Sequence, residues 1–283
     1  MLELTHEDDP MTSSIEATAR WTAAVRAAET ARIDRLFDDP WAASLAGQEG
    51  AAWFAGRPPG STLPIAIRTR FFDDWLRAIA LDGGIRQVVL LAAGFDTRAY
   101  RLPWAEGTKV FELDTPAVLA AKEEVLHGAG ATPSCDRRAV GADLAGDWTA
   151  ALLASGLDHV RPAAWLAEGV LFYLPREAID RILDAVDRLA APGSRLGFDI
   201  VNGHVLTSPW TKAWVEMQAA AGAPWIGTMD DPATELAARG WVAAVTQPGS
   251  PEVNHGRWTL PVVPAAMTEM PHSWYVTAER VRA

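Results

Sequence analysis

The sequence has 283 residues, of which 49% are hydrophobic, and its formal net charge is −11 at pH 7. A chain of this length can bury a large core and suits one elaborated domain, and an acidic balance without a basic stripe argues against a nucleic-acid partner. The one cysteine, Cys135, excludes an intramolecular disulfide framework and a multi-cysteine metal cluster.

The sequence also argues against membrane and metal sites. No stretch approaches the roughly 18 apolar residues of a membrane span, and residues 1–10 are acidic without the apolar core of a secretory signal. Histidines and acids show no ligand spacing such as His-x-x-x-His, so no metal is expected. We expect a soluble, cytoplasmic protein with no membrane partner, either a monomer or a homodimer.

The first third of the sequence has helical patterns. Small and apolar residues recur at helical spacing over residues 13–35, and Asp38-Asp39-Pro40 is typical of the start of a short helix over 41–45. Ile67, Phe71, Trp75 and Ile79 recur every fourth position and predict a helix over 63–81. We therefore expect an N-terminal helical cap region over residues 1–84.

From residue 85 to residue 283 strands alternate with helices, which is typical of a doubly wound α/β sheet. Seven strands are predicted, over residues 88–92, 109–113, 136–142, 163–167, 195–200, 241–245 and 274–278. A helical insertion over about 202–239 follows the fifth strand. It either packs on the core or forms a lid over the carboxyl ends of the strands, where ligands bind in such sheets.

The turn after the first predicted strand is the first candidate for ligand contact. A buried apolar run ends in Ala92-Ala93-Gly94, and small residues let a ligand approach the backbone closely. Asp114 ends the second strand, the position from which an acid typically binds ribose hydroxyls. This turn is not Gly-x-Gly-x-x-Gly, so a nicotinamide dehydrogenase is the poorer interpretation.

Two further acids follow strands three and four. Asp143 comes directly after small residues and can accept from an adenine amino group or cap the next helix. Glu168 interrupts an apolar run, and a buried carboxylate is costly without a partner. Glu168 is therefore expected either to contact a ligand or to form an ion pair, with Arg68 as the candidate partner.

Several of these motifs occur together in one known family. The sequence resembles the leucine carboxyl methyltransferase family in Thr22-Ala23-Ala24, Asp38-Asp39-Pro40-Trp41-Ala42, Arg68-Thr69-Arg70-Phe71-Phe72-Asp73-Asp74, Ala92 to Leu102, Phe111 to Pro116, Ala142-Asp143-Leu144 and Glu168 to Leu174. The resemblance runs from about residue 18 to the C-terminus. It is strongest to the bacterial branch, O-methyltransferases that use S-adenosylmethionine and often act on polyketides or other small metabolites. It implies a class I methyltransferase Rossmann-like fold, with S-adenosylhomocysteine as product.

The resemblance also implies roles for individual residues. Arg68 would contact the methionine carboxylate, and the turn of Ala92, Ala93 and Gly94 would lie against the methionine. By the same resemblance, the ribose would be bound by Asp114, the adenine by Asp143 and Leu144, and Glu168 would be the cofactor-side acid after strand four. The chain departs from members with a Gly-Ala-Gly turn at Ala92, which would be strained if its φ is positive.

Methyl transfer from a sulfonium mainly requires in-line alignment and exclusion of water. A carboxylate acceptor is already ionised at neutral pH and needs no base, whereas a phenol could give its proton to a histidine. His204, just past strand five, is the candidate base, with an exposed loop histidine as the alternative. Tyr173 and Arg26 are candidates for orienting the acceptor, if the N-terminal helix closes over the site.

The favoured function is therefore methyl transfer to a carboxylate or hydroxyl of a small molecule, a polyketide-like or aromatic secondary metabolite. Two alternatives stay open. A protein C-terminal carboxyl methyltransferase would have a shallow docking surface in place of an enclosed apolar pocket. A cofactor-binding protein without transferase activity is the third possibility, although intact Arg68, Asp114, Asp143 and Glu168 count against a degenerate cofactor site.

Overall fold

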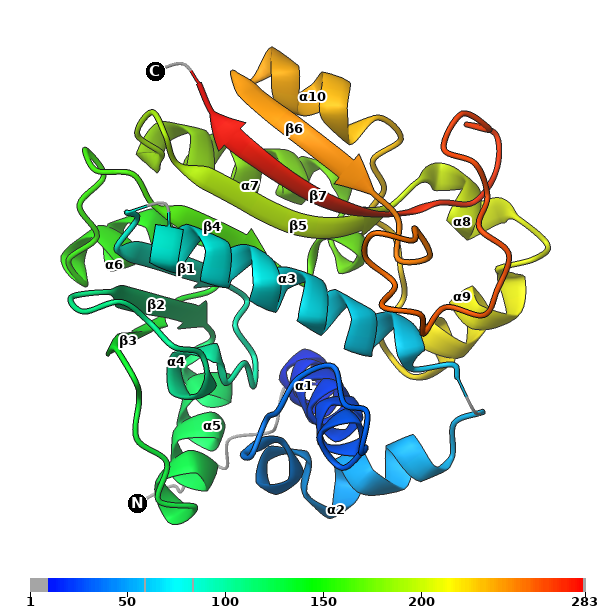
Figure 1. The fold of residues 1–283 in the computed structure, drawn as a ribbon, viewed down its shortest axis with the longest axis horizontal. Coiled ribbons are helices and arrows are strands. Elements are labelled where there is room, and N and C mark those ends of the chain that lie inside the picture. The colour runs from blue at the N-terminus through cyan, green and yellow to red at the C-terminus, as the bar shows by residue number, and fades with distance from the viewer. Residues whose placement is uncertain (1–9, 59, 83, 282–283) are drawn as a thin grey trace, which may run out of the picture.

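The computed structural model describes residues 10–58, 60–82 and 84–281. Within these residues seven strands form one mixed sheet in the order β3-β2-β1-β4-β5-β7-β6 (Figure 1). Only β7 runs antiparallel to its neighbours. The strands are β1 (Gln87–Leu91), β2 (Lys109–Asp114), β3 (Asp136–Gly141), β4 (Ala164–Ala167), β5 (Arg195–Val201), β6 (Trp241–Thr246) and β7 (Ser273–Arg280).

All seven predicted strands are confirmed, and their ends differ from the expected ends by at most two residues. The sequence predicts the central strands β1 and β4 because both faces of the sheet are covered there, so that these strands consist mostly of apolar residues. In β1 every residue is buried. The order reverses between β1 and β4, which creates a crevice at the carboxyl ends of these strands.

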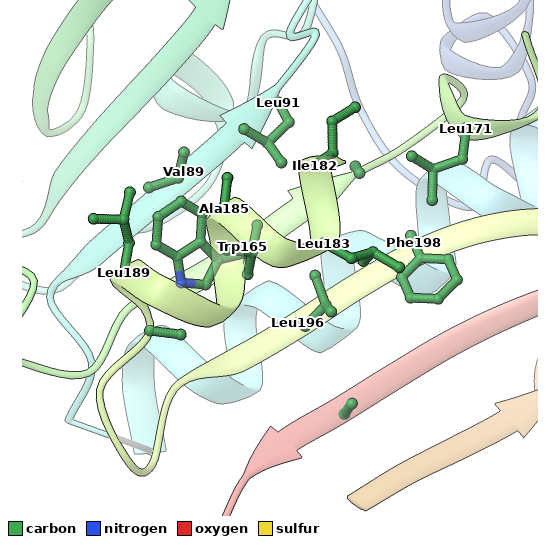
Figure 2. Close-up of a cluster of buried hydrophobic side chains, with 14 of the residues drawn as sticks. Val89, Leu91, Trp165, Leu171, Ile182, Leu183, Ala185, Leu189, Leu196 and Phe198 are labelled. Atoms are coloured by element: carbon green, nitrogen blue, oxygen red, sulfur yellow. The ribbon is translucent and has the colours of Figure 1, made fainter. Parts of the chain in front are cut away.

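The two faces of the sheet have separate cores. On one face, Trp165, Leu196 and Phe198 pack with side chains of α7 (Arg176–Leu189), as Figure 2 shows. On the other face, α3 (Leu63–Asp82) packs Phe72 and Leu76 against the sheet, and Figure 1 shows this helix running along it. The helical pattern predicted over 63–81 is therefore confirmed.

The N-terminal helices differ from prediction in their ends. Helix α1 (Pro10–Thr30) ends five residues before the expected end, and the segment after it folds back because Thr30 Oγ1 accepts a hydrogen bond from Asp39 N at 2.9 Å. Helix α2 (Ala42–Ala55) continues ten residues past the expected end. Gly47, with φ of 58°, kinks α2 without stopping it, and the alanine-rich segment beyond is a good helix former.

The remaining helices connect the strands or belong to the insertion after β5. The connecting helices are α4 (Arg98–Arg101), α5 (Pro116–Gly128), α6 (Trp148–Ala154) and the 3₁₀ turn η1 (Leu171–Tyr173). The insertion holds α8 (Gly203–Thr207), α9 (Lys212–Ala220) and α10 (Pro232–Ala238). At the C-terminal end of the insertion, α10 leads directly into β6. Helices α8 and α9 lie to one side of the sheet (Figure 1).

Close packing of α1 on α2 depends on Gly50, where an added Cβ would lie 2.6 Å from the carbonyl oxygen of Arg20. Gly50→Ala should therefore lower the free energy of unfolding by about 1–2 kcal/mol, because the helices must move apart. The matched control is Gly128→Ala, at a helical position with open space around it. This control should raise the free energy of unfolding by up to about 1 kcal/mol through helix propensity. Denaturant unfolding of both variants checks this, and equal effects would contradict it.

Candidate cofactor site

A cavity of about 430 Å³ opens at the carboxyl ends of β1, β2 and β4, where the strand order reverses. Its walls come from the sheet, from α1 and α3, and from residues 222–224 of the insertion. It is lined by all the predicted cofactor residues, Arg68, Ala92, Ala93, Gly94, Asp114, Asp143, Leu144 and Glu168, and by Arg26 and Tyr173. Side chains singled out from distant segments therefore form one contiguous site.

The turn after β1 is held in shape by the acid at the end of β2. Asp114 accepts a hydrogen bond from Gly94 N–H on Oδ2 and from Thr115 N–H on Oδ1, each at 2.7 Å. The side chain is buried, and this burial raises the pKa of Asp114. A carboxylate has about four acceptor positions. Asp114 can therefore accept hydrogen bonds from two neighbouring hydroxyl groups of a ligand while it fixes the turn.

Ala92 adopts the left-handed backbone conformation, with φ of 50°, and Gly94 in the same turn has φ of 48°. Glycine takes this conformation without cost, whereas a residue with a Cβ is strained there. The strain expected at Ala92 is therefore present. It occurs where the backbone turns sharply at the cavity wall, so the turn keeps its shape although the glycine of related turns is replaced.

Asp143 and Leu144 lie just beyond β3 and line the cavity. Asp143 Oδ1 accepts from Ala145 N at 2.8 Å, which closes a local turn. The side chain that caps the next helix is Asp147, which accepts from Ala150 N. The helix-cap alternative for Asp143 is therefore wrong, and its exposed carboxylate lies at the rim of the cavity.

Arg68 pairs with two carboxylates. Its Nε lies 3.0 Å from Glu168 Oε1 and its Nη1 lies 2.8 Å from Asp199 Oδ2. The predicted ion pair between Glu168 and Arg68 is confirmed, and because both residues also line the cavity, ion pairing and ligand contact are compatible. Burial raises the pKa of Asp199, an effect that Arg68 opposes.

A second buried arginine continues this network. Arg98 lies 2.7 Å from Glu168 Oε2 through Nη2 and 2.7 Å from Asp73 Oδ1 through Nε. It also pairs with Asp96, at 2.5 Å. Burial opposes ionisation of Asp96, but the neighbouring Arg98 outweighs it and lowers the pKa of Asp96 to about 2. Each carboxylate that contacts Arg68 or Arg98 thus has a cationic partner, although the acids outnumber the arginines.

Arg26 connects helix α1 to the turn after β1, which forms part of the cavity wall. Its Nε lies 2.8 Å from Asp39 Oδ2, and its Nη2 donates to the carbonyl of Phe95 at 2.6 Å. Thr97 Oγ1 donates to the same Asp39 oxygen at 2.7 Å. The guanidinium therefore holds α1 against the turn after β1. Arg26 also lines the cavity, and its role in orienting an acceptor stays a prediction.

The other two catalytic candidates have different positions. Tyr173 lines the cavity, and burial raises the pKa of its phenol. His204 is exposed on α8 and is not part of the cavity wall. The structure thus does not support His204 as the proton acceptor. On α8 the neighbouring residue Val205 is the one that packs into the protein, against Phe172 and Val201. Among the described residues that line the cavity, none is histidine, lysine or cysteine.

The insertion after β5 forms part of the cavity wall. Gly222, Ala223 and Pro224 line the cavity directly after α9. Behind them Trp225 packs against Phe172, with ring centroids 4.6 Å apart. The structure therefore agrees with the lid alternative. Within the insertion, Trp214 packs on Trp225, Met217 accepts from Arg57 of the N-terminal region, and Trp210 is exposed.

Four acids of this site were not predicted from the sequence: Asp39, Asp73, Asp96 and Asp199. The first three belong to motifs that carry the family resemblance, which was the available signal. Asp199 interrupts the apolar residues of β5 near the end of the strand, and Glu168 directly follows the apolar strand β4. The reasoning that predicted a partner for Glu168 applies equally to Asp199.

Two further findings concern the described residues only. No group of three or more histidine, cysteine, aspartate or glutamate side chains in them is arranged to hold a metal ion. No helix among them is both long and apolar enough to cross a membrane.

The strand order and the cavity at the carboxyl ends of the strands are those of a Rossmann-like class I methyltransferase fold. A Thermobifida fusca protein, described as an inferred methyltransferase, has a solved structure that aligns with a TM-score of 0.56 at 18% identity, covering 98% of this chain and 100% of that one. A Streptomyces avermitilis protein aligns with the same TM-score at 17% identity, over 94% and 99% of the two chains. Likeness at this identity shows the fold alone.

Sequence comparison identifies the family. The model of the leucine carboxyl methyltransferase family matches residues 19–187. Two Mycolicibacterium gilvum proteins, both named as inferred S-adenosyl-L-methionine-dependent methyltransferases, are 38% identical over 292 residues (95% of this chain, 96% of the relative) and 47% identical over 212 residues (69% of each). The chain belongs to the leucine carboxyl methyltransferase family. It is an S-adenosylmethionine-dependent methyltransferase.

Relief of the strain at Ala92 is measurable. Ala92→Gly should raise the free energy of unfolding by about 1 kcal/mol, because glycine adopts the positive φ without steric cost. Ala93→Gly is the matched control, since Ala93 is buried in the same turn without a positive φ. It should lower the free energy of unfolding by about 1 kcal/mol. A lower stability of Ala92→Gly in denaturant unfolding would contradict the prediction.

The ion network has a defined pH dependence. The folded pKa of Asp96, about 2, lies below the value of about 3.9 for an unfolded aspartate. Ionised Asp96 therefore stabilises the fold by about 2 kcal/mol above pH 4, and the contribution is lost as pH falls toward 2. The difference in free energy of unfolding between the wild type and Asp96→Asn should shrink over this window. A difference independent of pH would contradict the assignment.

Proposed function

We propose that this methyltransferase transfers the methyl group to an oxygen of a small molecule, a polyketide-like or aromatic secondary metabolite. The observation that carries this proposal is the cavity, which extends from the cofactor residues to an apolar wall between α1 and the insertion. This wall consists of small and apolar side chains, among them Ala19, Ile65, Val170, Leu174 and Ala223. Such a wall suits an apolar acceptor of limited size.

The residues present fit the cofactor. The buried guanidinium of Arg68 uses Nε and Nη1 on its two carboxylates, and an arginine has five N–H donors, so donors remain for the methionine carboxylate. Asp114 retains acceptor capacity for the ribose hydroxyls, and Leu144 offers an apolar surface to the adenine. When bound, the cofactor supplies an electrophilic methyl carbon on a sulfonium.

The chain itself contributes position and exclusion of water. The clamp between Arg26 and Asp39 keeps α1 against the turn after β1, and residues 222–224 enclose the cavity from the opposite side. Both walls keep water from the sulfonium, which needs only an aligned nucleophile.

Among oxygen acceptors, we favour a carboxylate over a hydroxyl. The described lining residues include no histidine, lysine or cysteine. Asp96 pairs with Arg98, which lowers the pKa of this carboxyl to about 2 and makes it a weak base. Glu168 is engaged by both Arg68 and Arg98. A carboxylate is ionised at neutral pH and needs no base, whereas a phenol with a pKa near 10 does.

The shape of the cavity, a partly open pocket with walls on two sides, also bears on the alternatives. A protein C-terminus would need a shallow docking surface, and the walls from α1 and residues 222–224 favour a small molecule instead. Against a protein without transferase activity, Arg68, Asp114 and Glu168 all line one cavity with acceptor or donor capacity to spare.

The direct test is methyl transfer from isotope-labelled S-adenosylmethionine to a panel of aromatic and polyketide-like carboxylic acids. Each acid is paired with the phenol of the same skeleton and with its methyl ester as a blank. We expect methyl esters from the acids and slower or no transfer to the phenols. Transfer only to a peptide C-terminus, or to none of the acceptors, would contradict the proposal.

The ribose assignment has a separate test. Asp114→Asn should weaken S-adenosylhomocysteine binding about 10- to 100-fold, because hydrogen bonds to a charged group contribute about 1.5–3 kcal/mol. The amide oxygen can still accept from Gly94 N–H, so the turn should persist. Asp136→Asn, at an exposed carboxylate that pairs with Arg138 on β3, is the control and should bind normally. Calorimetric titration checks both variants, and unchanged affinity of Asp114→Asn would refute the assignment.

A further inference from the structure

Asp199 is a buried carboxylate behind the cavity. It lies near the end of β5, and its Oδ1 accepts from Gly169 N–H at 2.6 Å while its Oδ2 lies 2.8 Å from Arg68 Nη1. Arg68, Glu168 and Gly169 line the cavity, whereas Asp199 does not. Any effect of Asp199 on a bound cofactor therefore acts through the residues that it holds.

Gly169 and Arg68 are in direct contact with each other. Gly169 has φ of 71°, and an added Cβ would lie 2.8 Å from Arg68 Nη2. The guanidinium thus lies against the Gly169 backbone. Asp199 accepts hydrogen bonds from both residues, from Gly169 N–H and from Arg68 Nη1. One carboxylate fixes the arginine and the peptide next to it.

The two acids on Arg68 occupy different positions. Glu168 binds Nε and is part of the cavity wall, whereas Asp199 binds Nη1 from outside the wall. Neither of these contacts uses Nη2, which faces Gly169 at the cavity wall. Without Asp199, Arg68 would keep only Glu168 as an anionic partner and could swing away from Gly169.

We propose that Asp199 is a positioning residue for cofactor binding, which holds Arg68 in the orientation that receives the methionine carboxylate of S-adenosylmethionine. This inference rests on the proposed role of Arg68. It also assigns a purpose to Gly169, whose missing side chain leaves room for the guanidinium at the position where Asp199 holds it.

The test uses two ligands that differ only at the end in question. S-adenosylhomocysteine carries the amino-acid carboxylate, whereas 5′-methylthioadenosine has the same nucleoside without it. In Asp199→Asn the amide oxygen still accepts from Gly169 N–H, but the charge that holds Arg68 is lost. We expect about tenfold weaker binding of S-adenosylhomocysteine and unchanged binding of 5′-methylthioadenosine, measured by calorimetric titration.

A double-mutant cycle shows whether Asp199 acts through Arg68. Arg68→Gln should weaken S-adenosylhomocysteine binding at least tenfold, and adding Asp199→Asn should weaken it no further. Asp199→Glu, which keeps the charge, should bind S-adenosylhomocysteine more tightly than Asp199→Asn. Thermal unfolding of each variant confirms that it is folded, and if Asp199→Asn does not fold, the comparison of the two ligands is made with Asp199→Ser, which also removes the charge.

The outcomes separate this inference from the proposed function. If Arg68→Gln binds S-adenosylhomocysteine normally, the proposed role of Arg68 is wrong, and the inference falls with it. If Arg68→Gln weakens binding but Asp199→Asn does not, only the role of Asp199 is overturned. Equal loss of both ligands in Asp199→Asn, or effects that multiply in the double variant, would also overturn it.

Discussion

The structure depends on a network of buried charges at the carboxyl edge of the sheet. Arg68 and Arg98 share Glu168, and Arg98 and Arg101 share Asp73. Burying an ion costs several kcal/mol, and removing one partner of a buried pair typically costs about 3–5 kcal/mol. The network therefore adds little net stability when complete, but it permits one arrangement of α3, the turn after β1 and the exit of β4.

This constraint explains how a helical segment that precedes the sheet becomes part of the site. Apolar contacts bring α1 and α2 together, and the contact between Arg26 and Asp39 then places α1 against the carbonyl of Phe95. On the opposite side the insertion after β5 supplies residues 222–224. Cap and insertion meet where Arg57 donates to Met217. The carboxyl edge of the sheet and Arg68 of α3 supply the proposed cofactor residues, and these two additions give the cavity its apolar side.

Much of the fold and of the cofactor site was predictable from local patterns. A parallel strand covered on both faces is a continuous apolar run, and the carboxyl ends of such strands meet at one edge. Asp114 and Glu168 follow two such strands and line the same cavity, and the cost of burying Glu168 alone pointed to Arg68. Local pattern does not identify partners that are distant in sequence, such as Asp199 for Arg68. It also does not determine where His204 lies relative to the cavity, because a position just past a strand does not determine which side of a short helix faces the cavity.

We propose that one cavity holds the whole cofactor, with Arg68 at the amino-acid end, Asp114 at the ribose and Leu144 at the adenine. A crystal structure of the protein with S-adenosylhomocysteine is the decisive test of this arrangement. We expect the methionine carboxylate on Arg68, both ribose hydroxyls on Asp114, and the sulfur directed toward the apolar wall near Tyr173. A nucleoside bound elsewhere, or a carboxylate that does not contact Arg68, would contradict it.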